Sequence, residues 1–333
     1  MQFSKQIPMR YLALILGIVS MIVVASCNHS KTETAQGPST EPSQTTYASA
    51  DAAVAALVSA ARAHSKDQLS DVLGPAADDV INSGDEVEDR HTMDNFVKQY
   101  DEKHTLTPNP DGSLTLVIGD KDWPMPIPIV KDSDDPTPWR FDTDAGEDEI
   151  INRRVGQNEL DTMQTCLAIV DAQRDYIQMD PTGAGVAVYA QKIVSDAGTK
   201  NGLYWDAKEG EQQSPLGPLM ADATDEGYVK ARQEAGKPIP YHGYCYHMLQ
   251  SQGPNAEGGA YDYVVNGKAI GGFALVAHPA DYGNSGVMTF IVNQDGVVYQ
   301  KDLGEQTEAI ASAMTTFDPD PSWKKSEPAT PAQ

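Results

Sequence analysis

His242 and His278 are the side chains of this sequence best suited to acid–base chemistry, because an imidazole titrates near neutral pH. His242 and His247 flank Cys245 in a stretch that is typical of a strand, YHGYCYHML. Side chains an odd number of positions apart lie on opposite faces of a strand, so these two histidines are not expected to share a metal ion. A lone histidine is more often a hydrogen-bonded structural residue, and we keep His242 and His278 only as candidates for catalysis.

The motifs of common catalytic and metal sites do not occur in the sequence. It has no GxSxG, HExxH, P-loop or CxxC pattern. The loop after Asp180 has the glycines of a calcium loop but lacks the carboxylates at alternate positions that supply its oxygen ligands. We therefore expect neither a cofactor nor a metal, and we favour a protein that is not an enzyme.

Three other groups of side chains have alternative interpretations. An acidic group can bind a cation or belong to a solvated loop, and we expect the loop; it comprises Asp85, Glu86, Glu88 and Asp89. Arg153 and Arg154 follow an acidic run and can form an anion site or local salt bridges, of which we expect the salt bridges. Aromatic side chains can line a glycan-binding surface or fill a core; they are Trp123, Trp139, Trp205 and Tyr204.

Residues 1–26 have the pattern of a secretory leader. Lys5 and Arg10 precede an uncharged stretch, residues 11–25, which is shorter than the about 20 apolar residues of a membrane span. The junction VASC, which ends at Cys27, resembles the lipobox of bacterial lipoproteins. The resemblance implies cleavage before Cys27, a diacylglycerol on its sulfur and an acyl chain on its new amine. The alternative is an ordinary signal peptide with an incidental cysteine.

The lipid on Cys27 would make the membrane a partner of this chain. Each buried methylene contributes about 0.8 kcal/mol, so several acyl chains anchor a protein stably. Asn28 follows in place of an aspartate, which favours the periplasmic face of the outer membrane by the sorting pattern of such lipoproteins. Residues 27–46 are rich in Ser, Thr, Gln and Pro and are predicted to form a disordered tether.

The chain of 333 residues is strongly acidic. It has 48 acidic and 24 basic residues, which gives a net charge of −24. Such a surface repels nucleic acid and anionic lipid head groups, so no nucleic acid partner is expected. The 306 residues after Cys27 are enough for two domains.

Residues 47–148 are predicted to form an N-terminal α+β domain. Helical patterns at 49–74 and 93–104 precede three stretches with the pattern of strands, at about 112–120, 123–132 and 138–144. Helices followed by a curved antiparallel sheet are similar to the nuclear-transport-factor-like cone fold. That fold often encloses an apolar pocket, so ligand binding and a filled core are both open.

Residues 149–323 are predicted to form a C-terminal α+β domain. A long helix capped by Asn158 precedes an antiparallel meander with hairpin turns at Asn266-Gly267 and Asp295-Gly296. This layout is similar to pseudopilin head domains, which implies a scaffold that presents loops to a partner. Residues 324–333 are predicted to be a disordered tail.

Cys166 and Cys245 remain once Cys27 is set aside. A disulfide between them would close a loop of about 80 residues and could stabilise the fold by about 4 kcal/mol in the chain-entropy model. The alternative is two separate buried thiols that act as small hydrophobic side chains. The sequence leaves both open.

Several long stretches of the chain resemble a proteobacterial family, domain of unknown function 2950. They include SGDEVEDR, LVIGDKDWPMPIP, WRFDTDAGEDEIINRRVGQNEL, GAYDYVVNGKAIGGFALVAHPADYG and GVMTFIVNQDGVVYQKDLG. The resemblance covers nearly the whole chain after Cys27. The family brings no established activity, so it informs the fold more than the function.

Three functions follow as hypotheses, one of which is a small-ligand carrier that uses the cone of the first domain. The favoured one is a membrane-anchored periplasmic lipoprotein that acts as a non-enzymatic binding or assembly module of the cell envelope, with an envelope protein or polymer as its partner. The alternative is a periplasmic hydrolase that acts on an envelope glycan or peptide through carboxylates and His242 or His278. The sequence names no substrate and no oligomeric state.

Overall fold

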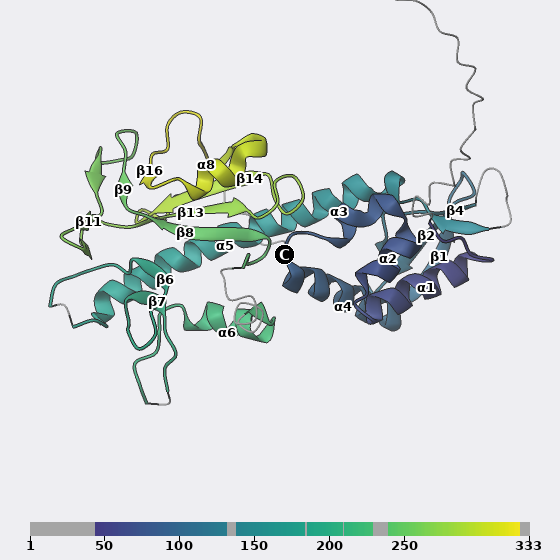
Figure 1. Ribbon diagram of the computed structural model, residues 1–333, viewed down its shortest axis with the longest axis horizontal. Helices are drawn as coiled ribbons and strands as arrows, with labels where there is room; N and C mark the ends of the chain where they lie inside the picture. Colours follow the sequence, from purple (N-terminus) through teal and green to yellow (C-terminus); the bar gives the residue numbers. More distant parts are fainter. Residues whose placement is uncertain (1–43, 132–137, 184, 209, 229–238, 327–333) are drawn as a thin grey trace, which may run out of the picture. The chain divides into compact units, whose positions relative to one another are not determined.

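The computed structural model of the chain describes residues 44–131, 138–183, 185–208, 210–228 and 239–326 (Figure 1). It contains helices and mainly antiparallel sheets, which confirms the predicted α+β class. The likeness to cone folds and to pseudopilin heads stays a prediction, as does the division into two domains. In the described residues, no helix is both long enough and apolar enough to span a membrane.

Short helices precede the first sheet. They are α1 (Ala50–Arg62), α2 (Lys66–Leu73), η1 (Pro75–Ala77), α3 (Asp78–Ile81) and α4 (Glu86–Glu102). The predicted cap of α1 is confirmed, because the Ser49 hydroxyl accepts a hydrogen bond from the Ala52 amide. Asp85 caps α4 in the same way, with bonds from Val87 N and Glu88 N.

The first sheet is antiparallel and has the order β1-β2-β4-β5, with β3 paired to β2. Its strands are β1 (His104–Pro108), β2 (Leu114–Ile118), β3 (Trp123–Pro124), β4 (Ile129–Lys131) and β5 (Trp139–Phe141). Apolar side chains of this sheet and of α1, α2 and α4 form one buried cluster. Pro126 and Pro128 lie in the segment of the chain between β3 and β4, both of which pair with β2. Proline has no amide hydrogen to donate to a neighbouring strand, so this segment is not a continuous strand.

A single helix, α5 (Glu147–Met179), follows the short turn η2 (Thr143–Ala145). It has 33 residues and is therefore about 50 Å long. The prediction that Asn158 caps this helix is wrong. The helix begins at Glu147, and its first turn contains three acidic residues. Their negative charges interact favourably with the positive end of the helix dipole. Asn158 is instead buried in mid-helix and donates to the Ser285 carbonyl at 2.9 Å.

The second large sheet is an antiparallel meander with the order β17-β15-β14-β13-β8, as predicted. Its strands are β8 (Tyr244–Leu249), β13 (Ala274–Pro279), β14 (Met288–Asn293), β15 (Tyr299–Asp302) and β17 (Lys324–Lys325). Side chains of β13 alternate between two cores, because successive residues of a strand face opposite sides. Leu275 and Ala277 join the cluster of α5, which runs along the sheet in Figure 1, and Ala274 and Val276 join that of α8.

Smaller elements surround this sheet. They are β6 (Lys192–Val194), β7 (Gly202–Tyr204), α6 (Gly217–Asp225), β9 (Ser251–Gln252), β10 (Tyr261–Asp262), β11 (Val264–Val265), β12 (Lys268–Ala269), η3 (Gly304–Gln306), α8 (Thr307–Ser312) and β16 (Thr316–Phe317). Asn266 and Gly267 form the predicted two-residue turn between β11 and β12, both with positive φ. β17 lies in the range predicted as a tail.

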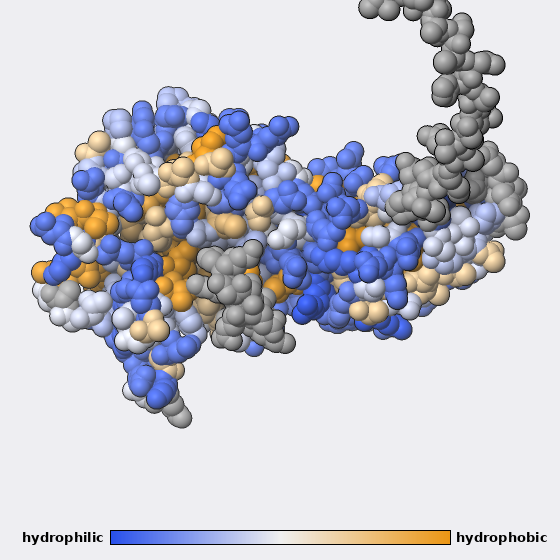
Figure 2. All heavy atoms as spheres, in the orientation of Figure 1, coloured by the Kyte–Doolittle hydropathy of each residue, from blue (hydrophilic) through white to orange (hydrophobic). Residues whose placement is uncertain are grey.

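The visible surface is mostly hydrophilic, as the net charge suggests (Figure 2). Apolar atoms gather at the end where Figure 1 places β11. Val265 and Ile270 are exposed in that region of the chain, with relative exposures of 41% and 50%.

Gly146, the N-cap residue of α5, and Gly156, within the helix, provide a matched test of this packing. A Cβ at Gly146 would lie 2.6 Å from the Pro126 carbonyl, so Gly146→Ala should lower the free energy of unfolding by about 1–3 kcal/mol. Gly156 has open space around it, and Gly156→Ala should raise that free energy by about 0.5–1 kcal/mol. Denaturant unfolding of both variants checks this. Equal stability of the two variants would contradict the packing at Gly146.

Candidate ligand-binding site

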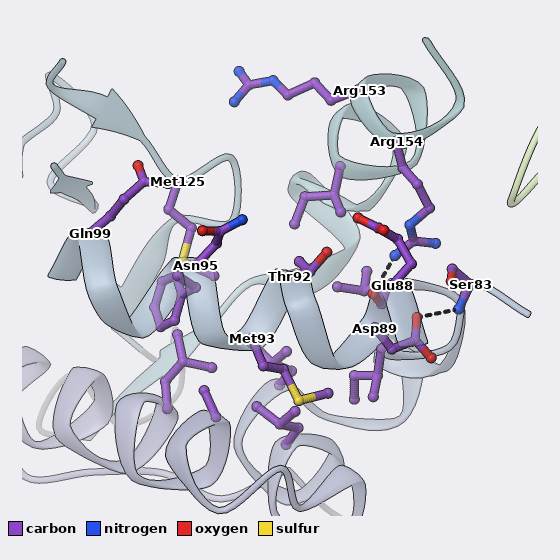
Figure 3. Close-up of a pocket in the computed structure, with 18 of the residues that line it drawn as sticks. Ser83, Glu88, Asp89, Thr92, Met93, Asn95, Gln99, Met125, Arg153 and Arg154 are labelled. Atoms are coloured by element: carbon purple, nitrogen blue, oxygen red, sulfur yellow. Dashed lines mark hydrogen bonds between the residues drawn. The ribbon is translucent and has the colours of Figure 1, made fainter. Parts of the chain in front are cut away.

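A cavity of about 510 Å³ lies between α4, the first helices, the edge of the first sheet and the start of α5. Its size is within the range of about 300–1,000 Å³ that is typical of small-molecule sites. Figure 3 shows α4 crossing the site, with Arg153 and Arg154 on the opposite wall. The cavity has an apolar part and a polar part, which differ in the elements that line them.

The apolar part lies beside the core of the short helices. Its lining includes Leu57, Ala61, Leu69, Leu73, Ile81, Met93, Phe96 and Ile118. In Figure 3 Met93 points away from the side of α4 that faces the two arginines. These side chains offer no charge and no strong hydrogen-bonding group, so this part of the cavity suits a hydrocarbon chain.

The polar part of the same cavity adjoins the apolar part and lies between α4 and the start of α5. Glu88, Thr92 and Asn95 line it and point towards the start of α5, and Gln99 lines it one turn further on, beside Gly119 at the edge of the sheet (Figure 3). Their spacing of three and four residues places them on one face, because an α-helix has 3.6 residues per turn. Trp123 and Met125 line the same cavity from the edge of the sheet.

Arg154 is the most constrained polar residue of the opposite wall. Its guanidinium donates to the carbonyls of Asp79 and Val80 and to the side chain of Asn284. No carboxylate of the described residues lies within 4.0 Å of it. Burial lowers the pKa of Arg154, although the carboxylates of Asp89 and other residues act against that effect from a distance. Protein groups thus already use much of its donor capacity.

Arg153 forms the predicted local salt bridge. Its Nε lies 2.7 Å from Glu149 Oε1, one turn earlier in α5. Its guanidinium carbon is 5.4 Å from the centre of the Trp123 ring, which is the geometry of a cation–π contact. The exposed salt bridge contributes little to stability on its own, but the two contacts fix the rim of the cavity.

The acidic group at 85–89 is not the solvated loop that the sequence suggested. Asp85 and Asp89 are buried, and the helix begins at Glu86. Asp89 accepts hydrogen bonds from Lys66 Nζ at 2.8 Å and from Ser83 N at 3.0 Å. Among the described side chains, no set of three or more His, Cys, Asp or Glu residues could hold a metal ion.

Asp85 also bonds to a distant part of the chain. Its Oδ2 accepts from the Tyr228 hydroxyl at 2.9 Å and from Gly243 N at 3.0 Å. Burial raises the pKa of Asp85, and these donors act in the opposite direction. Burial is also the main cause of the raised pKa of Tyr228, so this phenol stays protonated and donates.

His242 lies between two carboxylates. Its Nδ1 is 3.6 Å from Glu88 Oε2 and its Nε2 is 3.8 Å from Glu226 Oε2. The Glu226 oxygen is buried and has no hydrogen-bond partner among the described groups. Burial opposes the imidazolium, but Glu88, Glu226 and, from α5, Asp161 favour it and raise the pKa of His242. Burial also raises the pKa of Glu226.

The prediction that His242 belongs to a strand with His247 is wrong. His242 lies in the turn before β8 and has φ of 48°, because Asp85 and Tyr228 hold the neighbouring backbone. His247 is within β8 and contacts the Met314 carbonyl at 3.0 Å. The structure therefore brings His242 to Glu88, a residue that lines the cavity.

His278 has a structural environment. It is buried in β13, and its Nδ1 lies 3.0 Å from the Pro279 carbonyl. Burial lowers the pKa of His278. It does not line the cavity, so the structure does not bring the two candidate histidines to one site.

Cys166 and Cys245 are free thiols in the structure. Cys166 packs in the cluster of α5 beside Tyr244, and burial raises its pKa to about 12. Cys245 follows Tyr244 in β8, so its side chain faces the opposite side of the sheet. The two sulfur atoms thus lie on different faces, which disfavours the disulfide. Cys27, the predicted lipidation site, lies outside the described residues.

A family model described as "Protein of unknown function (DUF2950)" matches residues 44–326. The chain belongs to this family. The predicted resemblance is therefore confirmed, and the match spans all of the residues that the structure describes. No curated protein and no solved structure matches the chain.

The polar face of α4 was missed in the sequence. The helix was predicted to begin near Met93, so Glu88 and Thr92 lay outside it. Asp85 followed by Glu88 in the third helical position is a capping pattern that places the start correctly. With that start, the spacing of Glu88, Thr92, Asn95 and Gln99 becomes visible.

The environment of His242 predicts a pH-dependent contribution to stability. Its pKa is raised above the ordinary value of 6.5, so the contribution is fully present below pH 6.5 and is lost as the pH rises through the raised value. His242→Asn should therefore lower the free energy of unfolding most in acid and progressively less in base. Denaturant unfolding from about pH 5.5 to about pH 9 measures this difference.

His64→Asn is the matched control for the backbone. His64 has the same φ of 48°, but its side chain is 38% exposed and, among the described residues, pairs only with Asp94, itself 60% exposed, so the loss of that ion pair should change stability little. Asparagine tolerates this conformation, so neither variant introduces backbone strain. A destabilisation by His242→Asn that does not change with pH would contradict the charge interaction with Glu88 and Glu226.

Proposed function

We propose that this protein is a non-enzymatic binding module of the cell envelope, and that its ligand is a small amphipathic molecule. The single observation that carries the proposal is the cavity, in which apolar side chains of the first helices adjoin a polar face of α4. A site with these two kinds of lining suits a ligand that has an apolar part and a polar part.

The polar side chains of α4 support this proposal because their hydrogen-bonding groups are available to a ligand. Thr92, Asn95 and Gln99 form no side-chain hydrogen bond with any described residue. A polar group that a ligand shields from water needs a partner, and the ligand can supply it. The adjacent arginines are fixed by their own contacts, so this wall is organised before a ligand binds.

Lipid anchoring at the periplasmic face of the outer membrane is the second part of the proposal. Its support is the leader of residues 1–26, the lipobox-like junction at Cys27 and the polar stretch that follows. The acidic surface would keep the folded part away from anionic head groups. A protein anchored in this position could also bind an envelope protein or polymer.

A periplasmic hydrolase is the other candidate function. The observation that favours it is His242, which lies between two carboxylates, one of which lines the cavity. An imidazole with a raised pKa can exchange protons near neutral pH. Turnover of an envelope glycan or peptide that His242→Asn abolishes would favour this candidate over a binding module.

Blocking the cavity tests the binding function. Thr92→Trp places a large ring in the polar part, whereas Lys98→Trp places the same ring on an exposed position of α4 that does not line the cavity. Nile red, an uncharged apolar dye, should gain fluorescence with the wild type and with Lys98→Trp. With Thr92→Trp the gain should fall at least about tenfold, because the dye is excluded. Equal binding by the two variants would show that the dye does not use this cavity.

Replacing the predicted lipidation site tests the anchor. Cys27→Ala removes the thiol that would carry the diacylglycerol, so the protein should move from the membrane fraction to the soluble fraction of cells. Ser26→Ala keeps the cysteine and a small residue before it, and should leave the protein with the membrane. Immunoblots of fractionated cells measure both. Unchanged membrane association of Cys27→Ala would contradict lipid anchoring.

A further inference from the structure

The polar face of α4 has a composition that identifies the chemistry of the ligand. Thr92 and Asn95 are exposed, Gln99 is half-buried, and all three face the cavity (Figure 3). Each of these side chains both donates and accepts hydrogen bonds. A hydroxyl group also does both, so an array of hydroxyl groups is the natural complement of this face.

The charges around the cavity disfavour an anionic ligand head. Arg154 has much of its donor capacity taken by protein groups, and Arg153 is paired with Glu149. Four carboxylates influence Arg154 from a distance, and they belong to Asp79, Glu88, Asp89 and Asp281. An anion in the polar part would meet these carboxylates together with the two arginines, so it would gain little net attraction and few unused donors.

A cationic head is also disfavoured. Glu88 is the carboxylate of the polar face, and the His242 ring lies 3.6 Å from it on its other side. Arg153 and Arg154 face the same space across the cavity (Figure 3). A cation placed beside Glu88 would therefore meet two fixed positive charges, and would compete with His242 for the same carboxylate.

We propose that the ligand is a sugar joined to an apolar chain, with the uncharged sugar ring against the polar face of α4. The chain would lie in the apolar part, which Met93, Phe96 and Leu57 line. The Trp123 ring lines the same cavity as part of its wall, with the Arg153 guanidinium already over one of its faces. This inference rests on the proposed function, because it names the ligand of the same cavity.

Calorimetry with amphiphiles of matched chain length tests the inference. The ligands are n-octyl glucoside, n-octanol, octyltrimethylammonium and nonanoate, with n-octanol below its solubility limit and the others below their micelle concentrations. All are measured at about 0.15 M salt to limit long-range charge effects. Octyl glucoside should bind at least about tenfold more tightly than each of the others, because a few hydrogen bonds of ordinary strength give that factor. Free glucose should bind far more weakly than octyl glucoside, since each buried methylene adds about fourfold.

Variants of the polar face show where the sugar binds. Asn95→Ala combined with Gln99→Ala should weaken octyl glucoside about tenfold and leave n-octanol unchanged. Lys98→Ala, on an exposed position of α4 that does not line the cavity, should change neither. None of these three side chains has a hydrogen-bond partner among the described residues, so thermal unfolding should confirm that the variants fold.

The possible outcomes separate this inference from the proposed function. If nonanoate or octyltrimethylammonium binds as tightly as octyl glucoside, the sugar inference is wrong and the amphiphile site stands. If free glucose binds as tightly as octyl glucoside, the apolar chain is not part of the ligand and the inference is wrong. If no amphiphile binds the wild type, both the inference and the proposed function fail.

Discussion

The buried carboxylate of Asp85 fixes the position of α4, and the cavity depends on that position. It accepts hydrogen bonds from two amides of the first helical turn, from the Tyr228 hydroxyl and from Gly243 N. Four donors on one carboxylate offset the cost of burying its charge, which would otherwise be several kcal/mol. Because α4 supplies Met93 to the apolar part and Asn95 to the polar part, this one interaction orients both.

The cavity persists because its walls are held by groups that cannot collapse into it. Arg154 is fixed by backbone carbonyls and by Asn284, and Arg153 lies against Trp123. A guanidinium bound in this way keeps α5 and the residues before α4 in register without filling the space between them. The positive charges of the arginines and the negative charges of the carboxylates near the cavity nearly balance. An uncharged polar ligand therefore fits better than an ion. The acidic surface of the chain acts in the same direction, since it repels anions at long range.

Local patterns in the sequence were sufficient for the α+β class, the cap at Ser49, the meander and the turn at Asn266-Gly267, because hydrophobic period and turn chemistry act over a few residues. The strand β1 was missed because its side chains are mostly exposed and carry no alternating pattern. Asn158 was misread as a cap because its true partner, Ser285, is 127 residues away. The cavity was hard to predict for the same reason. The position of α4 depends on the hydrogen bond between Asp85 and Gly243, which are far apart in the sequence and meet only in the folded chain. A pocket in the first half was one of two open alternatives, but its lining by α5 was not foreseen.

The most direct test of this account is a crystal structure of the protein grown with n-octyl glucoside. We predict density for the sugar ring between the polar face of α4 and the start of α5, within hydrogen-bond distance of Asn95 and Gln99. The alkyl chain should extend towards Met93 and Phe96. A cavity that contains only ordered water at saturating ligand, or a glucoside bound elsewhere on the surface, would contradict the assignment of this cavity as a site for amphipathic sugars.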